Sequence, residues 1–148
     1  MQQTISMETV IDSDAPIAVF DTTDVDRVLG LFKRMTLTTG RAVYDWNPEH
    51  GLYRLGVEHI FIPRTRTPYD VLSYIAASRH YGIYVLRGLD SELQKPAIQT
   101  ALRKFAEKKG NVRRLIILMG DNIQLPSGLS DVVVHVRHAV RERSEAQI

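Results

Sequence analysis

The chain has 148 residues, enough for one domain with a buried core and short for two. A formal net charge of +2 permits contact with an acidic partner but does not require one. The sequence has no cysteine, so it can form neither a disulfide framework nor a thiolate metal site. It has no apolar run long enough to span a membrane and no basic leader at its start, so we expect a cytoplasmic protein without a membrane segment.

The first part of the chain predicts strand, helix and strand in that order. Residues 1–14 are polar, and we expect them to form a flexible lead. An apolar run over 16–20 predicts the first strand, and apolar residues over 25–35 recur at helical spacing. A second strand is predicted over 41–46. The segment 51–62 forms either a small hairpin or an edge strand.

The second part of the chain continues the alternation. Thr67 followed by Pro68 predicts the start of a helix, which Gly82 closes. The remaining predicted elements are a strand over 82–86, a helix over 96–109, strands over 114–119 and 131–136, and a charged tail over 139–148. No internal repeat is present.

Strands that alternate with amphipathic helices predict a three-layer α/β/α domain over 15–138, with a mainly parallel five-stranded sheet like that of RecA and the P-loop NTPases. The first strand should lie inside the sheet. The expected core residues are Ile17, Val19, Val28, Phe32, Val43, Ile83, Val85, Ile98, Leu102, Ile116, Leu118, Val133 and Val134.

The phosphate-binding residues of such a sheet are missing. No glycine is followed by lysine, and the segment after the first strand carries Asp21, Asp24 and Asp26, which would repel a triphosphate. The strand over 82–86 is followed by Arg87 where an ATPase needs an acid to hold its magnesium ion. The sequence therefore predicts a P-loop-like fold without a P-loop, with no nucleotide cofactor and no ATP hydrolysis.

Several segments resemble a known family. They are IAVFDTTDVDRVL (17–29), AVYDWNPEHGL (42–52), IYVLRGLD (83–90), ALRKFA (101–106) and LIILMGDNIQLPSGL (115–129). They are similar to the amino-terminal, degenerate ATPase-like domain of the AAA+ family first described from an open reading frame in chloroplast genomes. In that family a domain without Walker residues precedes an intact AAA+ domain, and here the sequence stops where that second domain would begin. The resemblance implies a stand-alone degenerate domain.

A non-catalytic protein-interaction or regulatory module is the function that these features favour, with an intact ATPase or a second copy of the chain as its partner. Because open α/β sheets bind ligands at the carboxyl ends of their strands, we expect the binding surface there. Its candidate residues are Thr22, Thr23, Trp46, Arg87, Asp90 and Asn122. Trp46 is expected to be partly exposed at the interface.

Two alternatives remain open. Four aspartates fall at the carboxyl ends of predicted strands and would suit a small metal-dependent nuclease or phosphohydrolase; they are Asp21, Asp45, Asp90 and Asp121. A basic stretch could instead contact nucleic acid; it contains Arg103, Lys104, Lys108, Lys109, Arg113 and Arg114.

Overall fold

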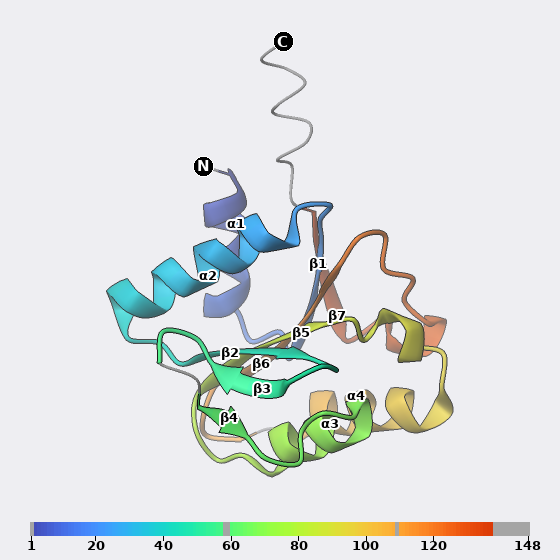
Figure 1. Cartoon of the computed structure of the whole chain (residues 1–148). Coiled ribbons are helices and arrows are strands. Elements are labelled where there is room, and N and C mark those ends of the chain that lie inside the picture. The colour runs from blue at the N-terminus through green and yellow to red at the C-terminus, as the bar shows by residue number, and fades with distance from the viewer. Residues whose placement is uncertain (1, 58–59, 109, 138–148) are drawn as a thin grey trace.

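The computed structural model describes residues 2–57, 60–108 and 110–137, and shows one sheet with helices on both sides (Figure 1). The helices are α1 (Gln2–Asp12), α2 (Val25–Thr39), α3 (Pro68–Ala77) and α4 (Pro96–Glu107), with short 3₁₀ turns η1 (Asp90–Glu92) and η2 (Ser127–Leu129). The strands are β1 (Ile17–Asp21), β2 (Val43–Asn47), β3 (Gly51–Arg54), β4 (Phe61–Ile62), β5 (Gly82–Arg87), β6 (Arg114–Gly120) and β7 (Val133–Arg137).

The sheet has seven strands in the order β4-β3-β2-β5-β6-β1-β7. The strands β2, β5, β6, β1 and β7 are mutually parallel, and two further strands extend the sheet beyond β2: β3 pairs antiparallel with β2, and β4 pairs antiparallel with β3. The predicted α/β class, with β1 inside a mainly parallel sheet, is confirmed, but the sheet has seven strands where five were predicted. The segment 51–62 supplies both a hairpin with β2 and the edge strand β4.

Each face of the sheet has its own core, because parallel strands bury both of their faces. Helices α1 and α2 cover one face, and α3 and α4 cover the other (Figure 1). The predicted core residues are buried with two exceptions: Val133 is only partly buried and Val134 is 40% exposed. Both lie on β7, which among the described residues is an edge strand with a neighbouring strand on one side only.

The first residues differ from the expected flexible lead, because residues 2–12 form α1. Met7, Val10 and Ile11 are buried against the α2 side of the sheet. Their spacing of three and four residues forms an apolar stripe, a signal that the polar composition of the segment obscures. The charged tail predicted over 139–148 lies outside the described residues.

Candidate functional site

The loop from β1 to α2 occupies the position where a P-loop would bind phosphate. Thr22 is buried, and its hydroxyl accepts a hydrogen bond from the Asp24 backbone N–H at 2.9 Å. The Asp24 carboxylate accepts from the Arg27 N–H at 3.2 Å and caps α2. The positive end of the helix therefore already faces a carboxylate of the same chain.

The carboxyl ends of β1 and β6 are joined through Asp21. Its carboxylate accepts a hydrogen bond from the Asn122 backbone N–H at 2.6 Å and lies 3.5 Å from His135 Nε2 on β7. Asn122 has a φ of 56°, a left-handed conformation that asparagine tolerates better than most residues. The site residue Asn122 thus contributes its backbone to holding three strand ends together.

Arg87 forms a bidentate ion pair inside the domain. Its Nε and Nη2 donate to the two carboxylate oxygens of Asp45 at 2.8 and 2.6 Å, and the Asp45 side chain is fully buried. Burial alone would lower the pKa of the Arg87 guanidinium, but the hydrogen bonds and charge of Asp45 raise it. Burial and the same carboxylate raise the pKa of Tyr53 to about 12. The residue that replaces a magnesium-binding acid is therefore part of the internal structure.

Trp46 is fully buried, so the expectation that it is partly exposed at the interface is wrong. Its indole Nε1 donates to the Thr65 carbonyl at 2.5 Å, and the Thr65 hydroxyl accepts from the Leu52 N–H at 2.9 Å. The hairpin strand β3 places Leu52 level with Trp46, and both side chains are fully buried. Trp46 anchors the hairpin to the sheet.

Three of the candidate interaction residues are exposed: Thr23, Asp90 and Asn122. The Asp90 carboxylate lies near Gly120 at the end of β6, since its Oδ1 would be 4.0 Å from a Cβ atom added to Gly120. The exposed part of the predicted surface is therefore a small polar strip at the ends of β1, β5 and β6.

The four aspartates of the metal hypothesis do not form one cluster. Asp45 is buried and bound by Arg87, and Asp21 accepts from the Asn122 backbone. Within 2–57, 60–108 and 110–137, no group of three or more histidine, aspartate or glutamate side chains is close enough to hold a metal ion. The structure thus gives this alternative no support.

The arginines of the basic stretch bind backbone carbonyls of their own chain. Arg113 donates to Val10, Ile11 and Ala15 at 2.6 to 3.0 Å, and burial lowers its pKa. Arg114 donates to three carbonyls at the end of α3, at Ile75, Ala76 and Ser78. Arg103 donates to Gly128 and pairs with Asp131 at 2.6 Å. Lys104 and Lys108 remain exposed, and Lys109 lies outside the described residues.

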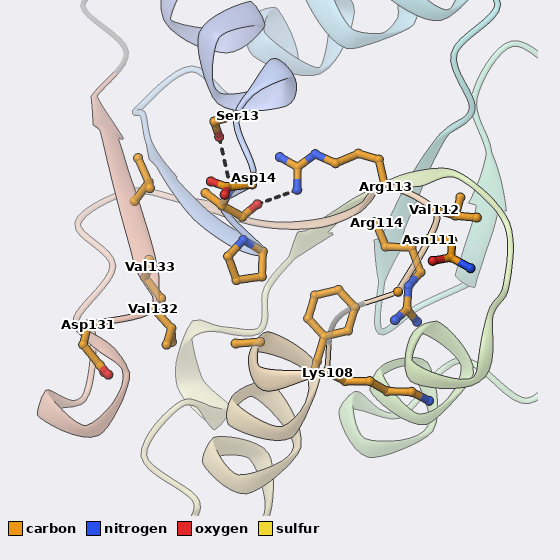
Figure 2. A pocket seen from close by; sticks show the side chains of 16 residues that line it. Ser13, Asp14, Lys108, Asn111, Val112, Arg113, Arg114, Asp131, Val132 and Val133 are labelled. Atoms are coloured by element: carbon orange, nitrogen blue, oxygen red, sulfur yellow. Dashed lines mark hydrogen bonds between the residues drawn. The ribbon is translucent and has the colours of Figure 1, made fainter.

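A hollow of about 650 Å³ lies at the opposite, amino end of the sheet. Figure 2 shows it between Ser13 and Asp14 before β1, Lys108 after α4, and Val132 and Val133 at the start of β7. The basic stretch of the sequence analysis supplies Lys108, Arg113 and Arg114 to this lining, but the hollow itself was not predicted, because its lining comes from segments that are far apart along the chain.

The fold and the missing phosphate loop define a class of protein, the ATPase-like α/β domains. Residues 2–138 match the family model of the N-terminal domain of SpoVK-like AAA ATPases, and the chain belongs to that family. This agrees with the resemblance found in the sequence. No curated protein sequence matches the chain. None of its described helices is long and apolar enough to cross a membrane.

Proposed function

We propose that this domain is a non-catalytic interaction module of an AAA ATPase system and neither binds nor hydrolyses ATP. The observation that carries the proposal is the closed loop between β1 and α2, where Asp24 caps the helix that would otherwise meet the phosphates. A triphosphate there would compete with a bound carboxylate for the same backbone N–H groups.

Electrostatics support the same conclusion. Asp21, Asp24 and Asp26 lie at or near this loop, and the segment 21–26 contains no lysine that would offset their charge. A phosphate charge brought within 4 Å of one of these carboxylates would be repelled by about 1 kcal/mol in water and by about 4 kcal/mol near a protein surface. Phosphoryl transfer depends mainly on positioning and charge stabilisation, and this arrangement opposes both.

The magnesium-binding position supports the proposal independently. Arg87 replaces the acid at the end of β5, and its guanidinium is tied to the buried Asp45. Recruiting either side chain for catalysis would leave the other charge without its partner in a desolvated site, which is costly. Asp90 is exposed at the surface and, among the described residues, belongs to no group of three or more acidic or histidine side chains that could hold a metal ion.

The role that remains is to provide contacts. The matched family is named as the N-terminal domain of an AAA ATPase, so the partner that we propose is an intact ATPase domain or a further copy of this domain. The basic stretch is a weaker candidate for contact with nucleic acid, since Arg103, Arg113 and Arg114 already donate within the chain.

Calorimetric titration of the chain with Mg-ATP tests the proposal. We expect no binding heat for native protein or for Asp90→Ala, which changes the nearest exposed acid. Micromolar binding of Mg-ATP by the native chain, or turnover that Asp90→Ala abolishes, would overturn the proposal. An intact P-loop ATPase titrated under the same conditions serves as the positive control.

A further inference from the structure

An open groove of about 570 Å³ lies between α2 and the segment that begins in β3, and we call it the α2 groove. Its wall on the helix consists of residues that share one face of α2, namely Asp26, Leu29, Gly30, Lys33 and Leu37. Its other wall is formed by Tyr53, Leu55, Gly56 and Val57. Leu37 is 66% exposed and Val57 is 40% exposed, so the groove presents apolar side chains to solvent.

Gly30 lies inside α2 at a position where its own fold does not require glycine. It is exposed, its φ is not in the left-handed region, and a Cβ atom added to it would meet nothing of the rest of the domain within 4 Å. Glycine is unfavourable in the interior of a helix. It does allow a second helix to approach closely, because the distance between packed helices depends on the side chains at their contact. The missing side chain therefore indicates that another helix packs against α2 at this point.

The two charged residues of the groove are available for a partner. Asp26 and Lys33 are both exposed, and neither side chain forms an ion pair in the part of the chain that the structure describes. Asp26 acts on Arg87 only through its charge. Asp26 and Lys33 are seven residues apart, about two helical turns, so they lie on one face of α2 with Leu29 and Gly30 midway between them. An acid before the glycine and a base after it complement a second copy of the same helix in the antiparallel direction.

We infer that a second copy of this chain occupies the α2 groove, with the two α2 helices packed antiparallel about a two-fold axis beside Gly30. The inference rests on the proposed interaction function and names the partner. When the axis passes between residues 29 and 30, Asp26 of each copy is level with Lys33 of the other, so both ion pairs form at once. The two glycines then lie at the axis, where the helices come closest. The exposed Leu37 and Val57 of each copy lie beside this contact and are covered by it.

Sedimentation equilibrium of the chain measures the association directly. We expect the native chain to reach twice its monomer mass at micromolar to submillimolar concentration. Gly30→Leu fills the space at the axis and should leave a monomer that melts no lower than the native chain, because leucine favours a helix and its side chain enters open space. The control Ser73→Leu adds the same side chain at an exposed position of α3, on the other face of the sheet, and should dimerise like the native chain.

A charge exchange identifies the contact. Asp26→Lys and Lys33→Asp each bring like charges together twice in the dimer, so each should weaken the association by about tenfold or more. An equimolar mixture of the two variants should regain the native association, because opposite charges then meet at both contacts. The double variant Asp26→Lys with Lys33→Asp should regain it alone for the same reason.

Three results overturn the inference: a native chain that stays monomeric, a Gly30→Leu variant that still dimerises, or a mixture that associates no more strongly than its components. A monomeric native chain that binds a purified intact AAA ATPase domain, with that binding lost in Gly30→Leu, would overturn it as well and assign the groove to that partner. These outcomes are independent of the titration with Mg-ATP, which alone decides whether the domain binds nucleotide.

Discussion

The two ends of the parallel sheet differ in whether their polar groups are bound within the chain or border a hollow. At the carboxyl end, the groups that a nucleotide would need are engaged within the chain, by the Asp24 cap and by the Arg87–Asp45 ion pair. At the amino end, three loops leave a hollow beside an edge strand that has no second neighbour among the described residues. The carboxyl end is therefore held by contacts among its own side chains, whereas the amino end carries the hollow.

Trp46→Ala should be the most destabilising change at the carboxyl end. The substitution empties a fully buried site and leaves the Thr65 carbonyl without its donor, so we expect a loss of about 4 kcal/mol in the free energy of unfolding. Urea denaturation measures it. Tyr69→Ala removes an aromatic ring that is 56% exposed and should change the stability by less than about 0.5 kcal/mol. Equal effects of the two variants would contradict the buried placement of Trp46.

Arg87→Ala should have the next largest effect. It leaves the Asp45 carboxylate buried and without its guanidinium, at a cost of about 3 kcal/mol. The double variant Asp45→Leu with Arg87→Met removes both charges and should recover much of that loss. The coupling between the two positions, measured by a double-mutant cycle, distinguishes this pair from an exposed one. An Arg87→Ala variant as stable as the native chain would mean that Arg87 is a free surface group.

The outcome at these two residues shows what the sequence could and could not predict. Apart from α1, strand and helix positions followed from apolar spacing, and the prediction that phosphate is not bound rests on acids such as Asp21 and Asp24. Exposure at the strand ends did not follow, because Trp46 packs in the core and bonds to Thr65, 19 positions away, and the partner of Arg87 is 42 positions away. Local patterns do not encode such long-range contacts.

For Val134 the burial predicted from the sequence was wrong in the opposite sense, because the residue was expected in the core and is exposed. Its run of valines is typical of a buried strand, yet β7 lies at an edge and Val134 is exposed. Strand order is set by how the helices cross over the sheet, which the composition of one strand does not report. The amino-end hollow was missed for a similar reason, since its lining residues meet only after folding.

Arg113→Met should loosen the amino end without unfolding the domain. The variant keeps most of the apolar stem but loses the hydrogen bonds to the Val10, Ile11 and Ala15 carbonyls, so we expect a loss of about 2 kcal/mol. Amide hydrogen exchange should accelerate in α1 and remain slow in β5 and β6. Lys108→Met, an exposed neighbour at the same hollow, is the control and should leave exchange in α1 unchanged. Protection of α1 that survives Arg113→Met would mean that the helix is held by its apolar stripe alone.

Asp24→Ala should produce the smallest of these changes. Loss of the cap leaves the Arg27 N–H without its side-chain acceptor and should cost about 1 kcal/mol, whereas Asp24→Ser retains an acceptor and should cost only a few tenths. Thr23→Ala, at the exposed neighbouring position, should have no measurable effect. Asp24→Ser also removes one negative charge from the loop. Titrating this variant with Mg-ATP therefore tests whether charge repulsion alone prevents nucleotide binding at the carboxyl end. We expect no binding, since the cap, the buried Thr22 and the missing lysine remain; binding by this variant would show that charge alone keeps the nucleotide out.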